Sequence, residues 1–188
     1  MPPAAMSEPA PRRPYWQPRE LILVGAFAAL TKLAGVVIAL AGGGMNPLSL
    51  ALKNTVATVL LVVLLLKAPK FGVLTLYVVS QSVFSLLLMG GSLMLLPGLL
   101  PAGILGDLLI RALGGYRRTW AVLVGVGVFD LLSKAIALGF SFLAFREDPR
   151  LFIMPAIFIG LGYLGSLLGL VGGLKFVKEL RHAGLIRA

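Results

Sequence analysis

Apolar runs of membrane-spanning length recur along the whole 188-residue chain. A helix needs about 20 mostly apolar residues to cross the roughly 30 Å hydrocarbon core of a bilayer. Hydrophobic residues make up 59% of the sequence and charged residues only 13%, which leaves more apolar surface than a soluble domain of this length can bury. The fold class we expect is all-α: an integral membrane bundle of six transmembrane helices in one domain.

The runs divide into six expected crossings. Their ranges are Leu21–Ala41, Leu48–Leu66, Phe71–Met89, Leu95–Leu113, Thr119–Ala144 and Leu151–Val177. The fourth run contains Pro97 and Pro101, and proline removes a backbone donor and disrupts a helix interior. This segment is therefore either a kinked helix or a half-helix entered by a loop buried in protein.

Lysine and arginine fall mainly on one side of this six-crossing path. That side holds Arg12, Arg13, Arg19, Lys67, Lys70, Arg111, Arg117, Arg118, Lys175, Lys178, Arg181 and Arg187. The other side has only Arg146 and Arg150, beside Glu147 and Asp148. The positive-inside rule then predicts cytoplasmic N and C termini in a bacterial or archaeal cytoplasmic membrane. The net charge of +10 indicates topology, with contact to anionic membrane lipid as a second role, and does not indicate nucleic-acid binding.

The same path sets the domain boundaries. Residues 1–19 are Pro-rich and polar, which predicts a disordered cytoplasmic tail rather than a cleaved signal peptide. We expect the transmembrane domain over residues 20–180 and a cytoplasmic tail over residues 181–188.

Five ionisable residues remain at membrane depth: Lys32, Lys53, Asp107, Asp130 and Lys134. A buried charge in a bilayer costs several kcal/mol unless it is paired or hydrated. One interpretation is structural, because Asp130 precedes Lys134 by four residues, the favourable order for an ion pair on one helix, and Asp107 precedes Arg111 by the same spacing. The other interpretation is a polar, ligand-filled cavity.

Helix direction places several polar residues at similar depth in the outer half of the bundle. The candidate substrate-binding residues are Lys32, Asn46, Lys53, Asn54, Gln81, Ser85, Asp130 and Lys134. Their unpaired excess is positive, which favours a small molecule with an anionic group. Lys53 is the weakest member, because a lysine near a helix end can extend its ammonium to the interface. The loop Ala41–Pro47 carries Gly42, Gly43 and Gly44 and is either a gate over this pocket or a plain flexible turn.

Small residues indicate where helices approach closely. The first helix has Gly25, Ala26 and Ala29, which we interpret as a docking face for a partner subunit. The glycines of "GLGYLGSLLGLVGGL" in the last helix favour packing within the bundle.

The sequence lacks the residues that several kinds of catalytic and metal site require. The sequence has no cysteine, and its one histidine, His182, lies near the C-terminal end. It has neither a Walker-type phosphate loop nor an acidic cluster of the kind that holds metals. We therefore expect no enzyme activity, no cofactor and no metal site, and a role as a membrane receptor, a carrier or a carrier subunit.

Three stretches resemble a known family: "PRELILVGAFAAL", "LPAGILGDLLIRALGGYRR" and "GYLGSLLGLVGGLKFVKELRHAGL". Their order, spacing and six-helix plan are similar to the substrate-binding S components of energy-coupling factor (ECF) transporters, most of all the MptD-like group. The resemblance covers most of residues 18–186 and implies capture of a vitamin or other micronutrient on the outer side. It also implies partners, namely a transmembrane coupling (T) protein and two ABC-type ATPases on separate chains.

Within that family the docking face for the coupling protein is often Ala-x-x-x-Ala, whereas this chain has Gly25 and Ala29 at that spacing. The resemblance also implies that the loop between the first two helices is the gate. Two alternatives stay open: a stand-alone secondary carrier driven by protons or ions through Asp107 and Asp130, and a non-transporting membrane scaffold.

Overall fold

The computed structural model of the chain describes residues 15–42, 46–89, 96–144 and 153–184. Within these ranges the chain forms six helices and no strand, which confirms the all-α prediction. The helices are α1 (Pro18–Ala41), α2 (Pro47–Lys67), α3 (Val73–Met89), α4 (Leu96–Ala112), α5 (Thr119–Ala144) and α6 (Ile153–His182).

Four of these helices, α1, α2, α5 and α6, contain stretches that are long and apolar enough to cross a membrane. In α3 the apolar stretch Val73–Leu87 is shorter. The six predicted crossings each correspond to one observed helix, and a helical membrane bundle is the architecture that satisfies all backbone hydrogen bonds in lipid.

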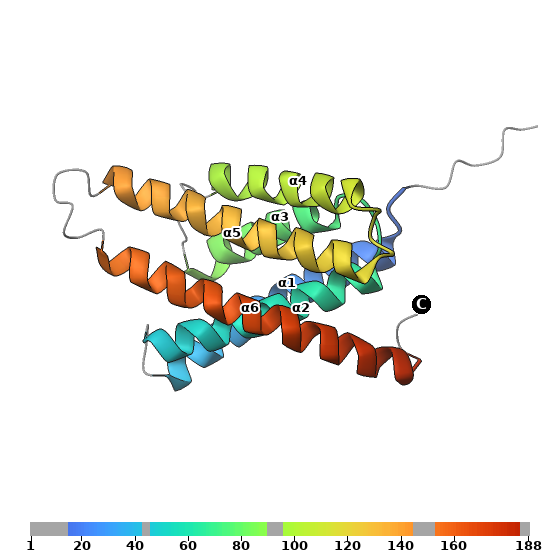
Figure 1. Ribbon diagram of the computed structural model, residues 1–188, viewed down its shortest axis with the longest axis horizontal. Coiled ribbons are helices and arrows are strands. Elements are labelled where there is room, and N and C mark those ends of the chain that lie inside the picture. The colour runs from blue at the N-terminus through green and yellow to red at the C-terminus, as the bar shows by residue number, and fades with distance from the viewer. Residues whose placement is uncertain (1–14, 43–45, 90–95, 145–152, 185–188) are drawn as a thin grey trace, which may run out of the picture.

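The helices form a closed ring. Going around it, α1 contacts α2, α2 contacts α6, and the ring continues through α5, α4 and α3 back to α1; α2 also contacts α5 across the ring. Figure 1 shows α3, α4 and α5 on one side of the molecule and α1, α2 and α6 crossing on the other. We call the end that carries the α2–α3 and α4–α5 turns the basic end, because Lys67, Lys70 and Arg111 lie there.

The helix starts have clear local causes. Pro18 opens α1 at a position where its missing backbone N–H is not needed, and Gln17 and Glu20 form a reciprocal capping box. At the start of α2, Asn46 accepts a hydrogen bond from the Ser49 backbone N–H at 2.7 Å. Tyr15 also lies against the bundle, since its hydroxyl donates to the Phe71 carbonyl at 3.3 Å. The N-terminal segment predicted to be a free tail to residue 19 is thus held against the basic end from Tyr15 onward.

The structure corrects the predictions for α4 and α6. α4 is one helix that runs through Pro101, and its 17 residues rise about 26 Å, slightly less than the hydrocarbon core. The helix already extends five residues before Pro101, so it is not a half-helix that begins at Pro101. α6 continues to His182, past the predicted end at Val177. The prediction stopped where the apolar stretch stops, but the helix also includes the polar residues Lys178, Glu179 and Arg181.

The apolar core occupies only the half of the bundle nearest the basic end. Its largest contribution is the continuous buried stretch from Leu61 to Leu66 in α2, packed with Val24 of α1, Leu74 of α3 and Val122 of α5. All other buried members of this core also lie in the helix halves or turns at the basic end. The buried serines Ser49, Ser82 and Ser166 lie in the opposite half.

The glycines of α6 form a close contact with α2, as predicted. A Cβ atom added at Gly165 would lie 2.4 Å from the Ala51 carbonyl oxygen, and one at Gly169 would lie 2.6 Å from the Thr55 carbonyl oxygen. The Thr55 hydroxyl lies 2.8 Å from the Gly165 carbonyl across this contact and 2.8 Å from the Ala51 carbonyl of its own helix, so its one proton is shared between them. Small residues here let two backbones approach closely enough for an interhelical hydrogen bond.

Candidate functional site

A hollow of about 210 Å³ lies between α1, α2 and α3. We call it the lysine pocket; its lining residues are Thr31, Lys32, Gly35, Val36, Lys53, Asn54, Ala57, Tyr77 and Gln81. Four of the eight predicted substrate-binding residues, Lys32, Lys53, Asn54 and Gln81, therefore lie around one cavity. Lys32 follows the start of α1 by 14 residues, about 21 Å along the axis, so the pocket lies near mid-membrane, beyond the apolar core.

The wall between α1 and α3 is held by a polar chain. The Gln81 amide nitrogen donates to the Ala28 carbonyl at 3.0 Å and to the Tyr77 hydroxyl at 2.9 Å, and Tyr77 donates to the Thr31 hydroxyl at 3.2 Å. Both of these Gln81 bonds use the amide nitrogen. Its carbonyl oxygen receives no hydrogen bond from any residue that the structure describes, so it is available to accept one from a ligand.

Gly35 lets Lys53 enter the pocket. A Cβ atom added at Gly35 would lie 3.1 Å from Lys53 Cε, so the aliphatic part of Lys53 lies directly over the α1 backbone. Lys53, the weakest of the predicted substrate-binding residues, thus lines the same cavity as Lys32. Lys53 is exposed and Lys32 is half-buried, and both ammonium groups would attract an anionic group bound in the cavity.

A second polar cluster lies beside the pocket, between α5 and α6. Lys134 lies 2.5 Å from both carboxylate oxygens of Asp130 and donates to the Ser166 hydroxyl at 3.0 Å. The Lys134 ammonium also lies 5.9 Å from the centre of the Tyr163 ring. The predicted Asp130–Lys134 pair therefore forms, with each side chain less than one-fifth exposed.

Gly162 of α6 joins the two clusters. A Cβ atom added there would lie 2.8 Å from the amide nitrogen of Asn54 and 3.4 Å from Lys134 Cε. Asn54 belongs to the lysine pocket, and Lys134 belongs to the ion pair. The two polar groups thus meet at one glycine, although Asp130 and Lys134 do not line the pocket itself.

The remaining predicted residues of the site have other positions. Asn46 caps α2, and its amide nitrogen donates to the Gly42 carbonyl at 2.6 Å, which ties the end of α1 to the start of α2. Ser85 lies one turn beyond Gln81 on α3 and does not line the pocket. Of the predicted gate loop, Gly42 is described as the residue that ends α1, and Gly43 and Gly44 lie outside the described residues.

Asp107 does not form the predicted pair with Arg111. Its carboxylate accepts hydrogen bonds from the backbone N–H groups of Leu74 and Thr75 at 3.2 and 2.9 Å, from the Thr75 hydroxyl, and from the Tyr116 hydroxyl. Burial and the bond to Asp107 raise the pKa of Tyr116 above its usual value, so the phenol keeps its proton and remains a donor. Asp107 thus stabilises the first turn of α3, whose N–H groups lack partners within the helix.

Sequence reasoning missed several residues of the site. Tyr77, Thr31 and Gly35 line the lysine pocket, and Ser166 completes the Lys134 cluster. Tyr77 precedes Gln81 by four residues, so helical spacing could have placed it on the same face of α3, although not its hydrogen bond. Thr31 is next to Lys32, and adjacent residues do not share a helix face, so spacing did not indicate it. Among the described residues there is no group of three or more His, Cys, Asp or Glu side chains that could hold a metal ion.

Residues 18–149 match a family described as a hypothetical bacterial integral membrane protein (Trep_Strep). This range is more than half of the chain. The chain belongs to the Trep_Strep family. It is therefore a multi-pass integral membrane protein, in agreement with its apolar helices.

The Trep_Strep match covers α1 to α5 and ends before α6 begins. It includes every residue that lines the lysine pocket, and both members of the Asp130–Lys134 pair. Ser166 and Gly162, which complete the second cluster and join it to the pocket, lie in α6 beyond the matched range. No curated protein and no solved structure matches the chain.

Proposed function

We propose that this Trep_Strep protein is the substrate-capture subunit of a multi-component importer of the ECF type. In this proposal the chain lies in the bacterial cytoplasmic membrane and binds a vitamin or other micronutrient. A transmembrane coupling protein and two ABC-type ATPases on separate chains supply the energy. The observation that carries the proposal is the lysine pocket, a polar cavity built by three otherwise apolar helices.

The chemistry of the pocket favours a small solute with an anionic group. Lys32 and Lys53 supply two ammonium groups, Gln81 supplies a carbonyl oxygen that can accept, and Asn54 supplies an amide that can donate and accept. The cavity of about 210 Å³ is smaller than the ~300–1,000 Å³ typical of sites for drug-sized ligands. Polar groups at this depth are costly unless a ligand or water satisfies them, which supports a binding role over a purely structural one.

The outer face of α1 supports the partner proposed from the sequence. Gly25 has no other group within 4 Å of a Cβ atom built on it, and Ala26 is exposed. Ala29 lies one turn further along and is half-buried. This strip of small residues leaves the α1 backbone open to close approach by a helix of the coupling protein.

A second candidate is a stand-alone carrier driven by protons or ions. The Asp130–Lys134 pair favours it, because a carboxylate at membrane depth beside a ligand cavity could exchange a proton during transport. The carboxylate of Asp107, the other acid proposed for this role, already accepts hydrogen bonds from the first turn of α3. The carrier hypothesis therefore depends on Asp130 alone.

Small molecules carried through purification provide the first test. We expect mass spectrometry of the detergent-purified protein to find a bound anionic solute of low mass, and that solute to raise the thermal unfolding temperature. Proteoliposomes separate the two candidates. Uptake only after co-reconstitution with the coupling protein and the ATPases would support the importer, and uptake driven by an ion gradient without them would contradict it. A third outcome, no thermal shift across a micronutrient panel, would favour the scaffold.

A further inference from the structure

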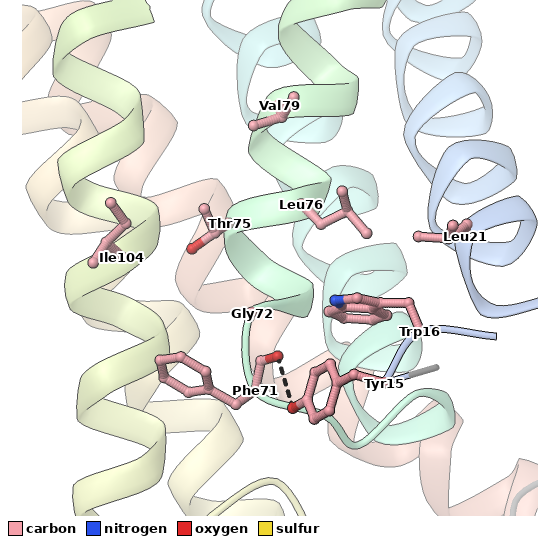
Figure 2. A pocket seen from close by; sticks show the side chains of 9 residues that line it. All are labelled: Tyr15, Trp16, Leu21, Phe71, Gly72, Thr75, Leu76, Val79 and Ile104. Carbon is pink, nitrogen blue, oxygen red and sulfur yellow. Dashed lines mark hydrogen bonds between the residues drawn. The ribbon is translucent and has the colours of Figure 1, made fainter. Parts of the chain in front are cut away.

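A second hollow, of about 480 Å³, lies at the basic end between α1, α3 and α4. We call it the aromatic groove; its lining residues are Tyr15, Trp16, Leu21, Phe71, Gly72, Thr75, Leu76, Val79 and Ile104. Figure 2 shows Tyr15, Trp16 and Phe71 gathered at one end of the groove, with Val79 at the other end on α3. It shares no lining residue with the lysine pocket.

The interior of this groove offers almost no polar group to a ligand. Thr75 directs its hydroxyl into the bond with Asp107, and the Tyr15 hydroxyl is bonded to the Phe71 carbonyl, as the dashed line in Figure 2 marks. The other walls are the side chains of Leu21, Leu76 and Ile104, the last of which is 46% exposed. From Gly72 to Val79 the groove extends about 10 Å along α3, away from the basic end. These properties suit a hydrocarbon chain aligned with the helices.

A cation lies at the aromatic end of the groove. The Arg111 guanidinium carbon is 5.4 Å from the centre of the Phe71 ring. Arg111 follows Ile104 by seven residues, so it lies on the same face of α4, about 10 Å nearer the basic end. No carboxylate lies within ion-pair distance of Arg111 among the described residues, because Asp107 is turned into α3.

The other nearby cation is already paired. The Lys70 ammonium lies 5.7 Å from the Tyr15 ring centre and 2.7 Å from the Glu20 carboxylate, and it also donates to the Tyr15 carbonyl at 2.9 Å. Arg111, in contrast, has no carboxylate partner among the described residues, so its guanidinium donors are available to a ligand. Guanidinium groups bind phosphate through two parallel hydrogen bonds, and stacking on an aromatic ring fixes their plane.

We propose that the aromatic groove binds an anionic phospholipid, with one acyl chain between α1, α3 and α4 and the phosphate at Arg111. Tyrosine and tryptophan mark the depth of lipid headgroups at a membrane interface, and Tyr15 and Trp16 lie at the same end of the groove as Arg111. A lipid headgroup at that depth would meet the guanidinium while its chain follows the apolar walls toward the bilayer centre. This site is independent of the solute pocket.

Trp16 is a built-in reporter for this test, since the only other tryptophan is Trp120. The experiment uses a Trp120→Phe protein in nanodiscs that contain phospholipids brominated on the acyl chains, which quench tryptophan on contact. We expect brominated phosphatidylglycerol to half-quench Trp16 at about fivefold lower mole fraction than brominated phosphatidylcholine. Arg111→Gln should remove this preference. Soluble glycerol phosphate should not compete, because it has no chain to fill the groove.

Lys67→Gln is the matched control, as Lys67 is an exposed cation at the same end of the bundle. It should leave the lipid preference intact. Equal quenching by the two lipids would overturn the proposal, as would a preference that survives Arg111→Gln or that is lost equally in Lys67→Gln. Weak quenching by both lipids would mean that another protein or a second copy of the chain covers the groove, and this also overturns it. If Trp120→Phe does not fold, Trp120→Tyr serves as the background.

Discussion

The carboxylate of Asp107 on α4 accepts a hydrogen bond from the backbone N–H of Thr75 on α3 at 2.9 Å. Asp107 is 1% exposed, so it acts as a buried cap that a different helix supplies to the first turn of α3. This contact joins α3 to α4 at the basic end, next to the apolar core.

Removing this carboxylate should destabilise the bundle without affecting the lysine pocket, which lies further along α3. We expect Asp107→Ala to lower the free energy of unfolding by about 2–3 kcal/mol, because two backbone N–H groups and the Tyr116 hydroxyl lose their acceptor. Asp107→Asn keeps one acceptor oxygen and should cost about half as much. Thermal unfolding in detergent measures both. Equal stability of wild type and Asp107→Ala would contradict the capping role.

The Asp130–Lys134 pair can be separated into structural and ligand-binding roles by a double-mutant cycle. Each single change, Asp130→Asn or Lys134→Met, leaves one charge of a largely buried pair without its partner and should cost about 3 kcal/mol. The double variant should recover most of that loss. The affinity of the double variant for the ligand then decides the role. If the pair is structural, the double variant should still bind the ligand. If the pair belongs to the binding site, the double variant should be stable but should not bind.

Helix positions were predictable because, in a membrane protein, an apolar stretch long enough to cross the bilayer forms a helix. α5 has the predicted bounds, and α2 differs from its predicted range by one residue at each end. The shared depth of Lys32, Lys53 and Gln81 also followed from helix direction, and these residues do line one cavity.

Depth does not determine the rotation of a helix about its own axis. For this reason Lys134 was expected in the pocket with Lys32, but it faces Ser166 across the α5–α6 contact. Asp107 was assigned to Arg111 by spacing along one helix, whereas the unsatisfied N–H groups of another helix compete better for its carboxylate. Tyr77 was missed because an aromatic residue in an apolar helix gives no indication that its hydroxyl meets a polar neighbour.

Lys32 is the residue whose charge the proposed pocket most requires. Lys32→Met keeps the length of the side chain and removes the ammonium, so we expect ligand affinity to fall about tenfold or more while the unfolding temperature stays near that of the wild type. Lys67→Met, at the exposed end of α2, is the control for net charge and should bind normally. Isothermal titration with the co-purified solute would measure both. Unchanged affinity in Lys32→Met would remove the lysine pocket as the binding site.

The open face of α1 should matter for assembly and not for ligand capture. Gly25→Leu places a bulky side chain where the structure has free space, so stability and ligand affinity should be unchanged. Recovery of the coupling protein and ATPases by co-purification should fall sharply. Gly160→Leu adds the same side chain at an open glycine of α6 and should leave recovery intact. Loss of ligand binding in Gly25→Leu would contradict the docking assignment.

The contact between α6 and α2 should tolerate no added methyl group at its closest points. Alanine at Gly165 or Gly169 would bring Cβ within 2.4 or 2.6 Å of an α2 carbonyl oxygen, so one helix must move and the hydrogen bond from Thr55 to Gly165 must lengthen. We expect each change to cost about 1–3 kcal/mol of unfolding free energy, although alanine is intrinsically the better helix former. Gly160→Ala, with free space around it, is the control and should be neutral or slightly stabilising. Because α2 carries Lys53 and Asn54, a displacement of this helix should also weaken ligand binding. Gly165→Ala should therefore reduce both the stability of the bundle and its affinity for the ligand, whereas Gly160→Ala should change neither.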